Sequence, residues 1–128
     1  MAKPKPDASK VATAIREFAL GLPGAWEDTP WEEDQVAKVG KKIFVFMGHL
    51  SDPTPTIAVK LPESHGQALG LECATPSGYG LGRAGWVSIE LAGRDRPSLE
   101  VLCDWVEESY RTIAPKKLIA ELDAAHES

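Results

Sequence analysis

The stretch TIAVKL, residues 56–61, decides the fold of this chain. Its apolar residues Ile57, Val59 and Leu61 alternate with smaller or polar ones, and Pro62 ends the pattern. Successive side chains of a strand point to opposite faces, so the alternation predicts a strand with one buried face. A strand of this kind is typical of an antiparallel sheet, which buries one face and leaves the other open.

Two neighbouring stretches extend this sheet. The stretch WVSIEL, residues 86–91, alternates in the same way, with its valine, isoleucine and leucine on the buried side. The stretch KIFVFM, residues 42–47, follows a hairpin turn at Gly40-Lys41. It is apolar on both sides, so two registers remain open. In one register Phe44 and Phe46 reach the open face, and in the other Ile43 and Val45 do.

Helical patterns surround these strands. Apolar residues at spacings of four, three and four predict a first helix over about 9–21, capped by Ser9 and ended by Gly21, Pro23 and Gly24. A short helix is expected within 63–71, and a long one from near Pro97 to Pro115. A final short helix is expected over 116 to about 123. Residues 75–85 are rich in turn formers.

The length of 128 residues matches a single domain. We expect a flexible tail over 1–8 and one domain over 9–124. Its class is predicted as α+β: a two-layer sandwich in which helices pack on one face of an antiparallel sheet. The other face of the sheet then meets solvent or a partner. That face is expected to expose Lys60 and Trp86, and exposed aromatic residues indicate a candidate binding surface.

The charge balance argues against nucleic acid, without excluding it. There are 14 Lys and Arg against 19 Asp and Glu, a formal net charge of −5. Nucleic-acid-binding domains usually carry a basic excess, although net charge averages over surfaces that a ligand never touches. Basic residues near predicted strand ends and turns therefore remain candidates, with an ordinary solvated surface as the alternative; they include Lys60, Arg83, Arg94, Arg96, Arg111, Lys116 and Lys117.

No motif predicts catalysis, a metal or a cofactor. The stretch GLGRAG, residues 80–85, has the GxGxxG spacing, but a strand instead of a helix is expected after it, so we interpret it as a turn. Acidic residues within 27–34 lack the spacing of a calcium loop and are interpreted as a solvated turn facing Lys38, Lys41 and Lys42. There is no GxSxG elbow. The protein is therefore expected not to be an enzyme.

Cysteine usage and hydropathy indicate a cytoplasmic protein. Cys73 and Cys103 have no metal-ligand spacing and are expected to be free thiols in a reducing compartment. No apolar stretch has the length of a membrane span, and residues 1–7 lack the apolar segment of a signal peptide. We therefore expect no membrane contact.

Several local strings, taken in order, resemble the YjbR/MmcQ-like family. They are GKKIF (40–44), VKLP (59–62), GWV (85–87) with Leu91, ESYR (108–111) and PKKL (115–118). The resemblance runs from about residue 12 to residue 122. It implies a small bacterial protein with a two-layer fold likened to frataxin-like and secretion-chaperone-like proteins. It also implies binding of DNA through a double-wing motif, without an established reaction.

The leading hypothesis is thus a non-enzymatic module that binds double-stranded DNA through the open sheet face. Its candidate contacts are Lys60, Arg83, Trp86, Lys41 and Lys42. The competing hypothesis is a protein-interaction or chaperone-like adaptor that uses the same face for another protein. Phosphate binding weakens steeply with salt whereas an aromatic protein interface does not, so salt dependence separates the two hypotheses.

Overall fold

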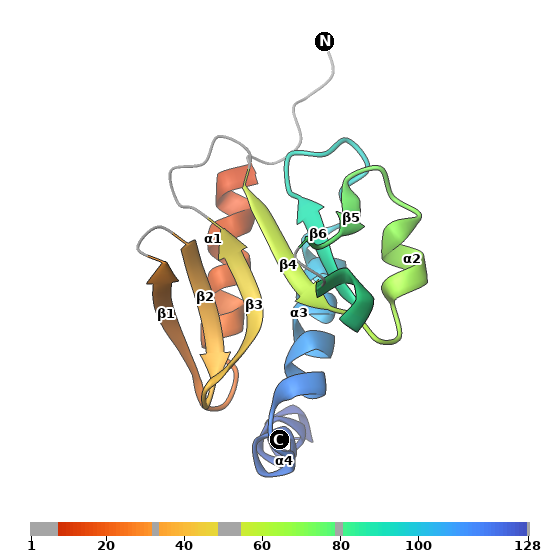
Figure 1. Cartoon of the computed structure of the whole chain (residues 1–128). Coiled ribbons are helices and arrows are strands. Elements are labelled where there is room, and N and C mark those ends of the chain that lie inside the picture. The colour runs from red at the N-terminus through yellow and green to blue at the C-terminus, as the bar shows by residue number, and fades with distance from the viewer. Residues whose placement is uncertain (1–7, 32–33, 49–54, 79–80, 128) are drawn as a thin grey trace.

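The computed structural model describes residues 8–31, 34–48, 55–78 and 81–127 (Figure 1). Its elements in chain order are α1 (Ala8–Leu20), β1 (Ala25–Trp31), β2 (Asp34–Val39), β3 (Lys42–Gly48), β4 (Thr56–Lys60), α2 (His65–Leu69), β5 (Ala74–Pro76), the 3₁₀ helix η1 (Leu81–Ala84), β6 (Trp86–Glu90), α3 (Leu99–Ile113) and α4 (Lys116–Glu127). The expected tail falls outside the described residues except for Ala8, the first residue of α1. No helix of the described part is long and apolar enough to cross a membrane.

The strands form one antiparallel sheet in the order β1-β2-β3-β4-β6-β5. Helices α1 and α3 lie side by side against one face of it, as Figure 1 shows. The predicted α+β class and two-layer architecture are therefore confirmed. We call the face away from α1 and α3 the open face.

The predicted inward residues of β4 and β6 form the centre of the core. At most 1% of each of these residues is exposed to solvent: Ile57, Val59 and Leu61 in the first stretch, and Val87, Ile89 and Leu91 in the second. From the helical layer, Leu102, Val106 and Tyr110 of α3 pack against them, also fully buried. The Tyr110 hydroxyl donates a hydrogen bond to the Pro23 carbonyl (2.6 Å), which ties α3 to the turn after α1.

A β-bulge in β3 overturns both predicted registers. Ala37 pairs with Val45, but Lys38 pairs with Ile43, so Phe44 is an extra residue on β3. Phe44 and Val45 are consequently both fully buried, and the Phe44 ring meets Tyr110 edge to face at 5.3 Å. Ile43 and Phe46 are left half-buried on the open face. Both registers assumed that side chains alternate strictly between the two faces of the sheet. The bulge breaks this alternation, because its extra residue places two successive side chains on the same face.

The predicted acidic turn is in part a strand. Glu27 and Asp28 belong to β1, where Glu27 pairs with Arg16 of α1 (2.5 Å) and Asp28 with Lys38 of β2 (2.7 Å). Glu32 and Glu33 lie outside the described residues. Acidic residues and proline are poor strand formers and mark edge strands, so β1 carries a weak sequence signal. The three-residue β5, within the stretch expected to be turns, was missed for the same reason, because it ends in Pro76.

A single hydroxyl from α3 separates β3 from β4 at one end. The two strands pair at Phe46–Ala58 and Val45–Val59, a register that would next bring Phe44 opposite Lys60. Instead, the side chain of Ser109 from α3 lies between the backbones of these two residues. Its Oγ accepts from the Lys60 backbone N–H (2.9 Å) and donates to the Phe44 carbonyl (2.5 Å). The ladder bond is thus replaced by a bridge through a buried side chain, and the strands diverge beyond it.

We predict that Ser109→Ala destabilises the protein by about 2–4 kcal/mol. Removing the hydroxyl leaves a buried N–H and a buried carbonyl without their partner, and each such loss costs about 1–3 kcal/mol. The measurement is urea unfolding followed by circular dichroism. Thr112→Ala on the same helix is the control, because its exposed hydroxyl donates to the Glu108 carbonyl of its own helix and bridges no strands of the described sheet. Equal, small losses in both variants would show that the bridge contributes little.

Candidate functional site

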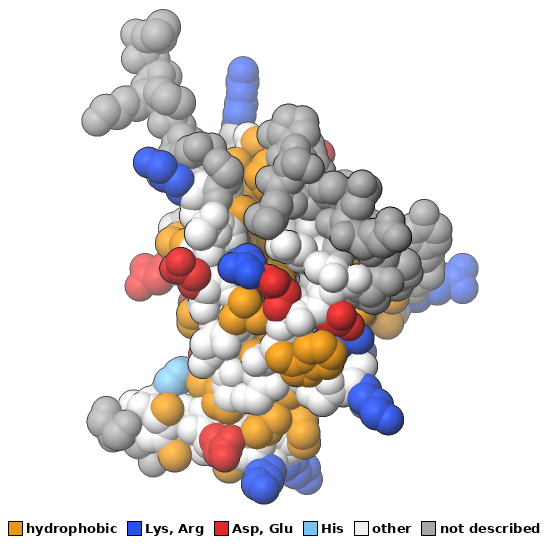
Figure 2. All heavy atoms as spheres, turned by 90° about the vertical axis from the view of Figure 1, so that its left-hand side faces the viewer, with side chains coloured by type: hydrophobic (Ala, Val, Ile, Leu, Met, Phe, Trp, Pro, Cys, Tyr) orange, Lys and Arg blue, Asp and Glu red, His pale blue; other side chains and the backbone are white. Residues whose placement is uncertain are grey.

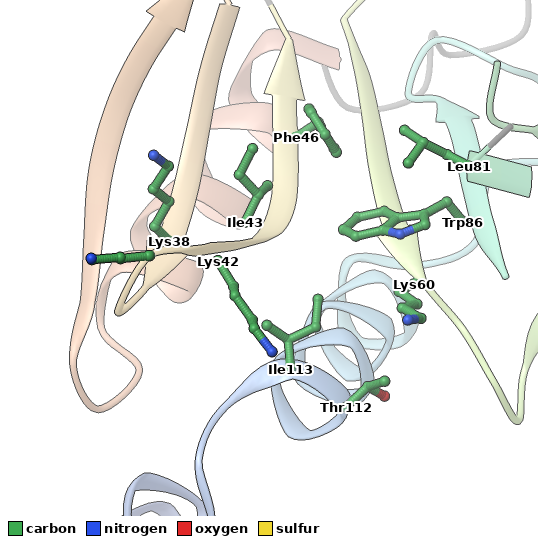
Figure 3. A pocket seen from close by; sticks show the side chains of 10 residues that line it. Lys38, Lys42, Ile43, Phe46, Lys60, Leu81, Trp86, Thr112 and Ile113 are labelled. Carbon is green, nitrogen blue, oxygen red and sulfur yellow. The ribbon is translucent and has the colours of Figure 1, made fainter. Parts of the chain in front are cut away.

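An open hollow of about 540 Å³ lies on the open face where β3 and β4 diverge (Figure 3). We call it the lysine hollow. Its lining comes from β2, β3, β4, β6, η1, the β2–β3 turn and the end of α3: Lys38, Lys41, Lys42, Ile43, Phe46, Lys60, Leu81, Trp86, Thr112 and Ile113. Helix α3 thus contributes from the opposite layer, at the end where Ser109 holds the strands apart.

The floor of the hollow is apolar. Phe46 and Trp86 meet edge to face with ring centroids 5.3 Å apart and an interplanar angle of 74°. Such aromatic pairs add to the stability that burial alone provides. Figure 3 shows Ile113 between the two strands, with Lys42 and Lys60 entering from opposite sides.

Trp86 lies on the open face but is only 7% exposed, which corrects the expectation of an exposed ring. Across the β4–β6 pair, Trp86 lies opposite Lys60. Val36, Ala58 and Phe46 are cross-strand neighbours on the same face, and Val36 is completely buried. The open face therefore has its own small apolar cluster, separate from the main core. Trp86 supports the floor of the hollow, with little ring surface free to contact a ligand.

The four lysines of the rim differ in their partners. Lys38 is paired with Asp28, and its Nζ also lies 5.3 Å from the centre of the Trp26 ring. The hydrogen bond from Lys38 lowers the pKa of the Asp28 carboxyl below its ordinary value, so this carboxylate is charged at neutral pH. Lys41, Lys42 and Lys60 have no side-chain ion pair with any described residue.

The backbone explains why these lysines converge. Gly40 turns β2 into β3 with a φ of +61°, a conformation that favours glycine. The indole N–H of Trp26 donates to the Gly40 carbonyl (2.9 Å) and anchors the turn to β1. Lys41 and Lys42 follow directly, while Lys60 ends β4 on the other side of the gap. Two separate strand ends therefore supply the ammonium groups that have no ion pair with a described residue.

Of the five residues predicted for the site, Lys41, Lys42, Lys60 and Trp86 line one hollow. Arg83 does not; it lies exposed on η1. Sequence reasoning missed the contribution of Thr112 and Ile113, because they fall within a helix that was assigned to the core.

The 3₁₀ helix η1 contains residues 81–84 of the GxGxxG string, and strand β6 follows it, as expected for a turn; Gly80 lies outside the described residues.

A second hollow of about 340 Å³ lies beside the first, with Thr112 at their common border. Acidic side chains line this acidic hollow: Glu63, Asp104, Glu107 and Glu108. Glu108 accepts from the backbone N–H groups of Glu63 and Ser64, both at 3.0 Å, and from the Ser64 hydroxyl at 2.6 Å. Glu107 pairs with Arg111 at 3.1 Å. These two carboxylates already have partners within the fold, and within the described ranges no group of three or more metal-ligating side chains is found.

Elsewhere the surface charge is mixed. Figure 2 shows the face on the β1 side, where acidic and basic side chains are interspersed. The lysine hollow differs from that face because no acidic residue contributes to its described lining. It is therefore a local basic site on an acidic protein.

The open antiparallel sheet, with α1 and α3 on one face and a basic hollow on the other, defines a small two-layer α+β protein with a candidate anion-binding face. The sequence model of the YjbR family matches residues 20–112, well over half of the chain, and the chain belongs to this family. The matched segment is shorter than the expected resemblance over 12–122, but it includes all four lysines, Trp86 and Ser109. No curated protein matches the sequence.

We predict that Trp86→Ala lowers the free energy of unfolding by about 3–5 kcal/mol, the usual cost of truncating a buried aromatic residue. Trp26→Ala, which removes a ring that is 44% exposed and one hydrogen bond to Gly40, is the matched control and should cost about 1 kcal/mol. Urea unfolding of both variants measures the difference. A Trp86→Ala protein as stable as the wild type would mean that this ring contributes little to the open-face cluster.

Proposed function

We propose that this protein is a non-enzymatic nucleic-acid-binding module whose lysine hollow contacts the phosphate backbone. The observation that carries the proposal is the convergence of Lys41, Lys42 and Lys60 on one hollow, without acidic partners among the described residues. Unpaired lysines grouped on one surface are the electrostatic requirement for phosphate binding. The likeness to a family implied to bind DNA supports the same proposal.

The net charge of −5 sets the strength of this binding rather than its location. A local basic surface attracts phosphates at short range, while the acidic remainder repels them over about one Debye length, roughly 10 Å at 0.1 M salt. We therefore expect micromolar affinity at low salt and little binding at high salt.

The free thiols of Cys73 and Cys103 fit a reducing compartment, and a cytoplasmic location is part of the proposal.

The charge reversal Lys41→Glu/Lys42→Glu tests the proposal. It should weaken binding of a labelled DNA oligonucleotide about 10- to 100-fold at 50 mM NaCl, because two phosphate contacts become repulsive. It should also reduce the slope of log K against log salt by about 2 for a duplex. Fluorescence anisotropy between 50 and 200 mM NaCl measures both effects.

The matched control is Lys116→Glu/Lys117→Glu, an equally exposed lysine pair at the start of α4 and outside the hollow. It changes the net charge by the same amount and should alter affinity far less. If both double variants lose affinity equally, only net charge matters and the hollow is not the site. If the wild-type protein binds no nucleic acid at 50 mM NaCl, the proposed function is wrong.

A second prediction concerns Lys38, which Asp28 holds in an ion pair. Asp28→Asn releases a fourth ammonium group to the hollow, so affinity at neutral pH should rise several-fold. Asp104→Asn, in the acidic hollow, makes the same change in net charge and is the control. Anisotropy titrations of both variants at pH 7 give the comparison, and an equal gain in the two would assign the effect to net charge alone.

The competing proposal is an adaptor that binds another protein through the same face. Its supporting observation is the apolar surface available there, including the ring of Trp26 beside the rim. A protein interface built on this surface keeps its affinity as salt rises, because apolar burial is insensitive to ionic strength in this range. The salt titration therefore separates the adaptor from the nucleic-acid module.

A further inference from the structure

We infer that the lysine hollow receives an unpaired base, so that the protein binds single-stranded nucleic acid in preference to a duplex. This inference rests on the proposed function and specifies its ligand. It comes from the combination of an apolar floor and a lysine rim, because phosphate contacts alone require only the rim.

The floor offers surface suited to a flat ring. Phe46 and Ile113 are half-buried and present apolar surface to the hollow, and Trp86 fixes the Phe46 ring by its edge-to-face contact. Proteins that bind single strands combine a basic groove with aromatic or apolar surfaces on which bases stack. The hollow places both kinds of surface within one site.

The concave shape favours a single strand over a duplex. A duplex presents phosphates on its outer surface and keeps the faces of its bases stacked inside. It can place a base in the gap between β3 and β4 only by unpairing and unstacking it. A single strand supplies an unpaired base without that cost. The volume of about 540 Å³ lies within the usual range of about 300–1,000 Å³ for small-ligand sites, and such a site holds one base rather than a paired helix.

The neighbouring acidic hollow restricts the path of the strand. Thr112 borders both hollows, and the acidic hollow beyond it sets four carboxylates against Arg111, so its described lining is net negative and repels phosphates. A bound backbone is therefore directed along Lys41, Lys42 and Lys60 and away from α3. This arrangement predicts one inserted base per protein molecule rather than a long stacked array.

Three ligands of equal length test the inference on the unmodified protein: a labelled 12-nucleotide thymidine strand, the same strand without bases, and a 12-base-pair duplex. Anisotropy at 50 mM NaCl should show the thymidine strand binding at least about tenfold more tightly than the abasic strand. It should also bind more tightly than the duplex, despite the greater charge of the duplex.

The outcomes separate the inference from the proposed function. If the abasic strand binds as tightly as the thymidine strand, or the duplex binds more tightly than both, the inference is wrong and phosphate binding by the rim still stands. If none of the three binds, both are wrong.

The variant Thr112→Trp provides an independent test, because it fills the hollow and leaves every lysine in place. It should reduce affinity for the thymidine strand to that of the abasic strand and leave the abasic strand unaffected. Thr13→Trp, which adds the same ring to an exposed position on α1, is the control. Unchanged thymidine affinity in a folded Thr112→Trp protein would overturn base insertion.

Discussion

The hydroxyl of Ser109 determines where this sheet opens. It occupies the place of a ladder bond between Phe44 and Lys60, and satisfies both backbone groups while keeping the strands apart. A buried N–H or carbonyl without a partner is costly, so strands do not diverge inside a fold unless another group takes over their bonds. Because α3 supplies that group, the open face acquires a concave site that a continuous sheet would lack. The lysines at the two strand ends then converge around this site.

The sequence predicted the layers well, and four of its five candidate residues line one hollow. The alternation in residues 56–61 and 86–91 identified two interior strands and their buried sides, because it reflects burial directly. The bulge at Phe44 was not predictable, since residues 42–47 are apolar on both sides and either phase fits. The hollow itself required tertiary information. Neither Ser109 nor Thr112 carries a local signal that its helix lies beneath a gap between two strands.

The net charge of the chain does not describe its local surfaces. A value of −5 describes the whole surface, but many acidic side chains serve the fold: Glu27 and Asp28 pair with basic residues, and Glu108 caps the segment before α2. The lysines without an ion pair to any described residue collect elsewhere, on segments that also carry the family resemblance. The strings around Lys41, Lys60, Trp86 and Ser109 are distant in the sequence and adjacent in the fold, since all of them build or hold open the same hollow.

The Ser109 bridge also has a consequence for the order of folding. Its two hydrogen bonds span 49 and 65 positions in the sequence, far more than the hairpin between β2 and β3. Contacts between distant residues form after local ones, because closing a longer loop costs more entropy. We therefore expect the hairpin to form before α3 docks, and the ends of β3 and β4 to reach their final partners when the helix arrives. Until α3 docks, the Lys60 N–H and the Phe44 carbonyl lack the partner that Ser109 provides in the native fold.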